Sequence, residues 1–208
     1  NSANSSHGGG MGNSYSSPTV TNCFFFNNSA SAGGGIENSF SSPVVTNCTF
    51  SNNSATEGAG ILCTSSSSPT ITNCTIDNNS ASWSGGGIEC DSPSSPTISN
   101  CIISNNSANY GGGMQCNEAS PVVINCIISN NTSNNGGGGI NNDDASSTFI
   151  NCTISGNNGP GGGLHSGDTS SSVSAVNCII WGNDAPDGQE LFNCAMPTYC
   201  CIRNWTGG

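Results

Sequence analysis

The chain has 208 residues, a length that suits one domain or one continuous array of repeats. One Lys or Arg stands against twelve Asp and Glu, which gives a net charge of −11 and excludes nucleic acid and anionic lipid surfaces as partners. No apolar stretch approaches the roughly 18 residues of a membrane-spanning helix, so we expect no membrane insertion.

The chain begins within a repeat, because Asn1-Ser2-Ala3 recurs as Asn28-Ser29-Ala30. A basic segment followed by an apolar core, the mark of a signal peptide, is not recognisable at its start. We expect a processed N-terminus or a segment of a longer protein.

An Asn-Cys pair marks each repeat along the chain. Self-similarity with a period of about 20–50 residues is typical of solenoids, in which each repeat covers the interior of the next. We therefore predict an all-β fold, a single-stranded parallel β-helix (β-solenoid) of about 7–8 coils of 24–27 residues. The cysteines of the pairs are Cys23, Cys48, Cys74, Cys101, Cys126, Cys152 and Cys178.

Within each repeat a β-branched segment leads to the Asn-Cys pair, as in residues 70–74. Ile71 points inward by strand alternation, yet Cys74 and Ile76 must also point inward. Asn73 therefore lies in a tight bend, because asparagine tolerates the left-handed conformation that such a bend needs. We expect the asparagines of these pairs to stack across coils as a hydrogen-bonded ladder.

Each repeat continues, in order, with a Phe or Ile, a further asparagine, small residues, a glycine run and an apolar residue. This order predicts three short strands and three turns per coil, and no window has the 3.6-residue apolar period of a helix. We assign residues 1–193 to the coils and residues 194–208 to an irregular terminal coil or cap. A narrow corner is expected at Ala30, Ala55, Ala81 and Ala108.

Two motifs give the repeat a family resemblance, F-x-x-N and G-G-[AG]-I. Residues 25–28 (FFNN) precede residues 33–36 (GGGI), and residues 50–53 (FSNN) precede residues 58–61 (GAGI). The combination resembles the repeat of polymorphic outer-membrane proteins and related bacterial right-handed β-helix proteins over nearly the whole chain, although later coils replace Phe with Ile. The resemblance implies a right-handed coil and a secreted or surface-exposed protein, and many members have no known activity.

Thirteen cysteines would ordinarily indicate disulfides in a secreted chain of this length. In one column of parallel strands, however, cysteines lie about 4.8 Å apart, whereas a disulfide needs Cβ atoms about 3.8 Å apart. We therefore expect buried free thiols in the Asn-Cys column. A second column is expected at Cys63, Cys90, Cys116 and Cys194.

In the irregular tail, two alternatives stay open: a disulfide and a metal site. The tail cysteines are Cys194, Cys200 and Cys201. C-x-x-C spacing and a nearby His are missing, which weighs against a metal there. The sequence indicates no cofactor.

Paired carboxylates cleave glycosidic bonds, and parallel β-helices often degrade polysaccharides. Asp143 and Asp144 form the only adjacent acidic pair, and His165 lies one coil later, so these three residues are the catalytic candidates. The alternative is a solvated turn, because neighbouring strand residues point opposite ways. Lyase chemistry needs a basic residue, and the coils contain no Lys or Arg. We predict that the protein is not an enzyme.

The acidic charge also raises the question of calcium, which repeat-toxin solenoids bind through G-G-x-G-x-D repeats. Glu37 and Glu89 follow glycine runs, but Leu62, Gln115 and Asn141 interrupt their column. The sequence therefore predicts no row of metal ions.

N-x-[ST] sequons are frequent, either because Asn, Ser and Thr are the turn residues of the repeat or because the chain is glycosylated. The asparagines of the Asn-Cys pairs, as in Asn47, Asn73 and Asn151, are expected to be poor acceptors at ladder corners. We expect better glycan acceptors in the exposed turns, at Asn52, Asn78, Asn105 and Asn130.

The outward strand columns are uncharged and β-branched, which reflects either ordinary strand propensity or a contact surface. From them we predict a secreted or cell-surface structural module that associates with itself as a filament, fibre or adhesin-like layer. Two alternatives stay open: a β-helix that binds or cleaves carbohydrate, and an ice-binding face of Thr-x-Thr rows. The candidate association face consists of Val122, Ile124, Ile150 and Val176.

Overall fold

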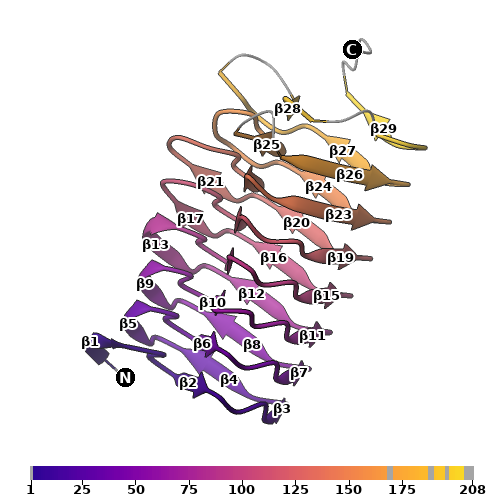
Figure 1. The fold of residues 1–208 in the computed structure, drawn as a ribbon. Helices are drawn as coiled ribbons and strands as arrows, with labels where there is room; N and C mark the ends of the chain where they lie inside the picture. The colour runs from indigo at the N-terminus through magenta and orange to yellow at the C-terminus, as the bar shows by residue number, and fades with distance from the viewer. Residues whose placement is uncertain (1, 168–170, 187–189, 195–196, 204–208) are drawn as a thin grey trace.

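The protein is an elongated stack of parallel strands, seen here in a computed structural model that describes residues 2–167, 171–186, 190–194 and 197–203 (Figure 1). Successive coils lie side by side from the N-terminus to the C-terminal coils, and every pair of named strands is parallel. The described residues contain no helix, and hence none that is long and apolar enough to cross a membrane. The predicted all-β parallel solenoid is confirmed.

Four sheets run along the stack. Sheet A contains β1 (Ser2–His7), β5 (Ser29–Ala32), β9 (Ser54–Glu57), β13 (Ser80–Ser84), β17 (Ser107–Ala108) and β21 (Thr132–Ser133). Sheet B contains β2 (Met11–Ser14), β6 (Ile36–Ser39), β10 (Ile61–Thr64), β14 (Ile88–Asp91), β18 (Met114–Asn117), β22 (Ile140–Asp143), β25 (Leu164–Ser166) and β28 (Leu191–Phe192).

The other two sheets meet at the Asn-Cys bends. Sheet C contains β3 (Thr19–Thr21), β7 (Val44–Thr46), β11 (Thr70–Thr72), β15 (Thr97–Ser99), β19 (Val122–Ile124), β23 (Ser146–Ile150) and β26 (Ser172–Val176). Sheet D contains β4 (Phe24–Phe26), β8 (Thr49–Ser51), β12 (Thr75–Asp77), β16 (Ile102–Ser104), β20 (Ile127–Ser129), β24 (Thr153–Ser155), β27 (Ile179–Trp181) and β29 (Cys201–Ile202).

The expectation of three strands per coil is wrong, because the alanine segment forms a fourth strand and not a corner. Ala55 pairs in register with Ala81, and the two pack in a small buried cluster with Ala59 and Ala108. Small side chains let this segment lie close to the next sheet while its backbone continues the ladder of hydrogen bonds. This fourth strand forms sheet A.

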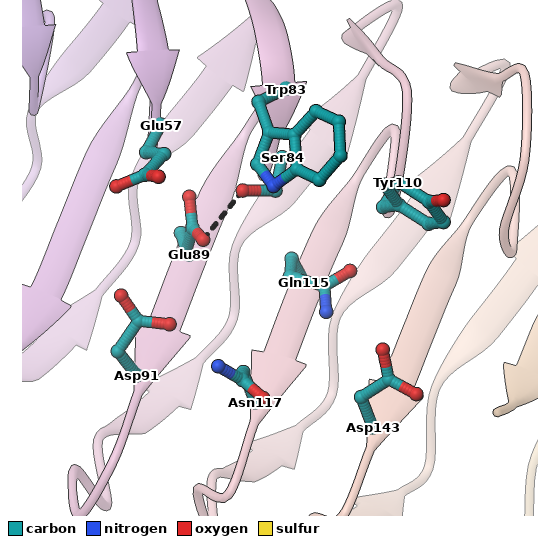
Figure 2. A pocket seen from close by; sticks show the side chains of 9 residues that line it. All are labelled: Glu57, Trp83, Ser84, Glu89, Asp91, Tyr110, Gln115, Asn117 and Asp143. Carbon is teal, nitrogen blue, oxygen red and sulfur yellow. Dashed lines mark hydrogen bonds between the residues drawn. The ribbon is translucent and has the colours of Figure 1, made fainter. Parts of the chain in front are cut away.

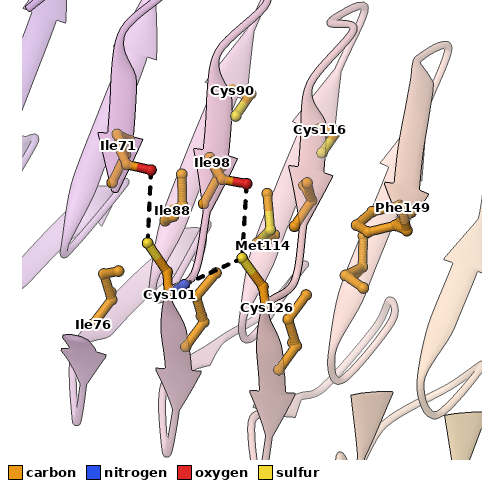
Figure 3. Packing of buried hydrophobic residues seen from close by; sticks show 14 of the residues in the cluster. Ile71, Ile76, Ile88, Cys90, Ile98, Cys101, Met114, Cys116, Cys126 and Phe149 are labelled. Carbon is orange, nitrogen blue, oxygen red and sulfur yellow. Dashed lines mark hydrogen bonds between the residues drawn. The ribbon is translucent and has the colours of Figure 1, made fainter. Parts of the chain in front are cut away.

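Like residues stack on like, as the repeat requires. Ile71 pairs with Val45 on one side and Ile98 on the other, and all three are buried. Figure 3 shows the resulting interior, where aliphatic and cysteine side chains from sheets B, C and D meet. One coil alone leaves this face open, so the fold depends on stacking.

The cysteines are free thiols, as expected for the Asn-Cys column. The Cys101 Sγ donates to the Ile71 carbonyl at 3.7 Å, and the Cys101 backbone N–H donates to the Cys126 Sγ at 3.4 Å. The column thus adds weak hydrogen bonds to its packing (Figure 3). Burial and register, and not cross-linking, keep it in place.

Two expectations for the remaining cysteines are corrected. The second column ends at Cys116, which pairs with Asn142, and Cys194 instead follows a positive-φ bend at Asn193. The tail disulfide is absent: the Cys194 Sγ donates to the Phe192 carbonyl at 3.2 Å, and the Cys200 Sγ donates to the Thr198 carbonyl at 3.4 Å. Cys201, next to Cys200, is exposed. Cys200 packs against the core, whereas Cys201 is exposed, so the last two side chains point to different sides.

The positive-φ bend at the Asn-Cys pair is confirmed, with φ 54° at Asn73. The continuous buried ladder, however, is formed by the asparagine five residues after each cysteine. Asn106 is typical: its Nδ2 donates to Asn131 Oδ1 at 3.0 Å, and its Oδ1 accepts from Asn79 Nδ2 at 3.0 Å. The asparagines of the Asn-Cys pairs are exposed instead. Their side chains hydrogen-bond to one another only in later coils, as Asn151 does to Asn125 at 3.1 Å. The members of the buried ladder are Asn28, Asn53, Asn79, Asn106, Asn131, Asn157 and Asn183.

A carboxylate ends the ladder. Glu190 Oε2 accepts from Asn183 Nδ2 at 2.7 Å, and Oε1 accepts from the Gly182 N–H at 2.8 Å. In the expected terminal coil, 194–208, β29 adds to sheet D beside β27. Residues 195–196 and 204–208 of that segment lie outside the described residues.

Candidate functional site

A groove forms on the outward face of sheet B, because the turn from sheet A folds back over it. Gly85 has φ +62°, and a Cβ there would lie 2.5 Å from the Cβ of Glu89. Only glycine fits this close return at such a φ value. As a result Glu89, which points away from the core, is only 4% exposed.

The groove encloses about 420 Å³ and spans several coils (Figure 2). Its wall comes from the end of sheet A and the following turn, and its floor comes from β14, β18 and β22. The wall residues are Glu57, Trp83, Ser84 and Tyr110. The floor residues are Glu89, Asp91, Gln115, Asn117 and Asp143.

The floor is ordered by strand register. Glu89 pairs with Gln115 on the next strand, and Asp91 pairs with Asn117, which in turn pairs with Asp143. Residues two apart in a strand share a face, so Glu89 and Asp91 both point into the groove. Carboxylates and amides therefore alternate along the floor (Figure 2).

Two aromatic side chains form the upper wall. Trp83 is 53% exposed, and its ring centroid lies 5.3 Å from that of Tyr110 at an interplanar angle of 62°. Edge-to-face contact of this kind holds both rings in place, and Trp83 stays half-exposed. The groove thus combines an apolar stacking surface with hydrogen-bonding groups.

The carboxyl group of Glu89 is the most perturbed group in the groove. Burial, followed by the negative charge of Asp91, raises its pKa from 4.5 to about 8. Its Oε1 accepts a hydrogen bond from Ser84 Oγ at 2.7 Å, whereas Oε2 is buried with no hydrogen-bond partner among the described residues. Burial also raises the pKa of Asp91, and Glu57 adds to the effect.

A second hollow of about 310 Å³ lies on the same outward face, over β2 and β6. His7 Nδ1 and Glu37 Oε1 are 2.7 Å apart in it. Burial raises the pKa of Glu37, and the His7 contact opposes the rise. His7 occupies the register column of Ala32, Glu57 and Ser84, so both hollows have the same construction.

The model of the family described as a right-handed beta helix region matches residues 1–112 and 78–208, which together cover the chain. The chain belongs to the right-handed β-helix family. No curated protein and no solved structure matches it. The family fixes the handedness of the coil and leaves the ligand open.

In this β-helix the three catalytic candidates do not converge. Asp143 lines the groove floor, whereas Asp144 is exposed in a bend with φ 47°. His165 lies on β25, where its Nδ1 is 2.8 Å from Asn141 Oδ1 and its ring stacks on Phe192.

Glu37 and Glu89 lie on the same column of sheet B with Leu62 between them. Within the described residues, no three His, Cys, Asp or Glu side chains are arranged to hold a metal ion.

The four candidate glycosylation sites form one exposed column of bends after sheet D. Their φ values lie between 55° and 56°. Asn105 Nδ2 donates to Asp77 Oδ1 at 2.8 Å, and Asn52 Nδ2 donates to Ser51 Oγ at 2.9 Å. The exposed column consists of Asn52, Asn78, Asn105 and Asn130.

The candidate association face lies on sheet C and is half-buried. Ile124, Ile150 and Val176 are direct neighbours across three strands, while Val122 lies in the other outward column beside Thr148. The larger exposed apolar surface lies on sheet D. Its members are Phe24, Phe26, Ile102, Ile127, Ile179 and Trp181.

Sequence reasoning missed the wall of the groove. Glu57 and Tyr110 directly precede a glycine run, and Trp83 precedes one with a single serine between. The sequence signal that could have identified them is this shared position before the glycine run. A residue there lies over the outward face of sheet B, which the glycine turn covers.

Proposed function

We propose that this β-helix is a secreted or cell-surface module that binds carbohydrate in the sheet B groove, without cleaving it. The observation that carries the proposal is that the half-exposed Trp83 lines the same groove as a floor of carboxylate and amide groups. Sugar rings present apolar C–H faces that stack on indole, and their hydroxyl groups hydrogen-bond to carboxylates and amides.

The groove also runs along the stack of coils, as a binding site for an extended oligosaccharide needs to. Its floor crosses three neighbouring strands, and the hollow at His7 and Glu37 lies on the same face two strands before β14. An oligosaccharide lying along the stack would meet a new set of polar groups at each coil. The three catalytic candidates give cleavage no support, because Asp144 and His165 do not share the groove with Asp143.

The location and the repeat type belong to the same proposal. The F-x-x-N and G-G-[AG]-I motifs support a repeat of the polymorphic outer-membrane protein type, whose members are typically secreted or surface-exposed. A glycan ligand fits that location.

Binding is tested by titrating the intact chain with a panel of soluble oligosaccharides in a calorimeter. Trp83→Ala should weaken the binding of any recognised oligosaccharide by about tenfold or more, because it removes the stacking surface. Trp181→Ala is the matched control, since Trp181 is 51% exposed on sheet D, away from the groove. Equal loss in both variants, or no binding by the wild type, would reject the proposal.

Self-association is the second candidate function, and the outward faces of sheets C and D favour it. Phe24 is 82% exposed, and Asp77 is the only charged residue in the described strands of these two sheets. In a chain of charge −11, a second copy meets least repulsion on these faces. Sedimentation velocity should show a dimer or larger species that Phe24→Ser with Trp181→Ser disrupts. Monomers at all concentrations would remove this candidate.

A further inference from the structure

The groove contains acidic groups with no cation to balance them. Glu57, Glu89 and Asp91 come from two strands and face the same cavity (Figure 2). The only Lys or Arg in the sequence is Arg203, which follows β29 in sheet D. His7, the nearest histidine along sheet A, bonds to Glu37 and not to this cluster. None of the described residues that line the groove is basic, so a ligand is the natural source of a balancing positive charge.

Glu89 supplies an independent sign of that ligand. Its Oε2 is buried and has no hydrogen-bond partner among the described residues. An unsatisfied buried oxygen is costly, and native proteins leave few of them. The Glu89 side chain lines the cavity (Figure 2), so a small rotation of its carboxyl group on binding would bring Oε2 to a donor of the bound molecule.

The chemistry of the cavity favours an ammonium group over a metal ion. A divalent metal needs oxygen atoms gathered at about 2.0–2.6 Å, and no described group of carboxylates is arranged in that way. An ammonium has three donors that reach more widely spaced acceptors, and it is attracted to an aromatic face such as that of Trp83.

We propose that the groove is selective for a saccharide that carries a protonated amine, with the ammonium group placed among Glu57, Glu89 and Asp91 beside Trp83. The proposal rests on carbohydrate binding in the same groove and names its substrate class. Each N–H donor of the ammonium pairs with a carboxylate, and Glu89 Oε2 gains the partner that it lacks.

Binding should also move a proton. Free Glu89 has a raised pKa of about 8, so it is protonated at pH 5.5, and a neighbouring ammonium favours its ionised form. The other ionisable groups lining the cavity are Glu57, Asp91, Asp143 and Tyr110, and none of them is basic. Amine binding at pH 5.5, where the amino groups of the ligand are already protonated, should therefore release up to about one proton per site.

The test compares the glucosamine tetrasaccharide with its N-acetylated counterpart, titrated calorimetrically into the intact chain at pH 5.5 in two buffers of different ionisation heat. The amine form should bind about tenfold tighter and release a proton, whereas the N-acetylated form should release none. Glu89→Gln should reduce the preference to about threefold or less and abolish proton release. Asp91→Asn should reduce the preference without abolishing proton release.

The outcomes separate the two proposals. Equal affinity for both tetrasaccharides, lost in Trp83→Ala, would overturn amine selectivity and leave carbohydrate binding intact. A preference for the amine that persists unchanged in both carboxylate variants would also overturn it, because the cation would then bind elsewhere. If neither tetrasaccharide nor any of the neutral oligosaccharides binds, both proposals fail.

Discussion

The outward faces of sheets B and D arise from the same repeat and have opposite properties. On sheet B, Glu89 points outward and is only 4% exposed, within a groove lined by three further carboxylates. On sheet D, Phe24 points outward and is 82% exposed, and Asp77 is the only charged residue in the described strands. Polar groups are thus enclosed on one face, while apolar groups are displayed on the other.

The difference lies in the turn that precedes each face. Before sheet B the glycine run folds back, and Gly85 brings the chain against the Cβ of Glu89. Before sheet D the chain turns at one asparagine, such as Asn73 with φ 54°, and nothing returns over the strand. In a solenoid, a groove therefore needs a turn that covers the neighbouring strand, and glycine makes that turn sterically possible.

The largest predicted effect is the response of the groove face to pH. Because the folded pKa of Glu89 is raised, the native chain holds a proton that the unfolded chain has lost, so stability falls as pH rises from about 4.5 to 8. The free energy of unfolding should fall by about 3–5 kcal/mol over this window. Glu89→Gln should remove most of the fall, leaving the smaller shares of Glu37 and Asp91.

Urea denaturation across this pH range measures the effect. Trp181→Ala on sheet D is the control, because it leaves every carboxyl group in place and should keep the pH slope of the wild type. An equal fall in wild type and Glu89→Gln would show that Glu89 is not the buried acid.

The second effect concerns the frame that both faces share. Asn106→Ala removes four hydrogen bonds of the buried ladder, to Asn79 (twice), Asn131 and Ile76. It should lower the free energy of unfolding by about 3 kcal/mol, because buried partners are left unsatisfied. Asn105→Gly, which keeps the positive φ at the exposed neighbour, should cost below about 1 kcal/mol in the same denaturation experiment. Similar losses in the two variants would show that the ladder hydrogen bonds add little to the free energy of unfolding.

The third effect tests the turn itself. Gly85→Ala adds a Cβ 2.5 Å from Glu89 at a positive φ, and it should cost about 2 kcal/mol and open the groove. Gly182→Ala is matched in φ, at +70°, with nothing within 4 Å, and should cost only about 1 kcal/mol. Thermal unfolding of both variants gives the comparison. Equal losses of stability in the two variants would mean that the glycine turn does not pack tightly against Glu89.

The smallest effect is a difference in thiol access with no change in stability. Cys201 is exposed on sheet D, whereas Cys90, behind the groove floor, is 0% exposed. Alkylation of the native chain should label Cys201 first, and Cys201→Ser should remove that fast step. Mass spectrometry of timed samples identifies the labelled residue. Rapid labelling of Cys90 would contradict the burial of the core column.

The sequence predicts the repeating parts of this molecule well, because stacking forces each coil to obey the same rule. The inward column through Ile71, the bend at Asn73 and the free thiols of the Asn-Cys column all follow from periodicity. The fourth strand was missed because Ala55 and its neighbours are small and carry little apolar signal. The buried ladder was placed one turn too early, since both asparagine columns recur with the same period.

The groove was harder to predict because it depends on what varies between coils. Glu57, Trp83 and Tyr110 occupy comparable positions and have different side chains, so no recurring residue type marks these positions in the sequence. Glu89 was considered only as a calcium ligand, since its burial depends on the fold of the preceding turn. In such a solenoid, function therefore depends on the residues that break the repeat and that the fold brings together.

The most direct test of the account uses the two tryptophans that distinguish the faces. The indole N–H signals of Trp83 and Trp181 can be followed in ¹⁵N-labelled protein during titration with the glucosamine tetrasaccharide. We expect a saturable shift of the Trp83 signal while the Trp181 signal stays in place. A shift of Trp181 alone, or no shift of Trp83 at saturating ligand, would contradict the assignment of the binding site to the sheet B groove.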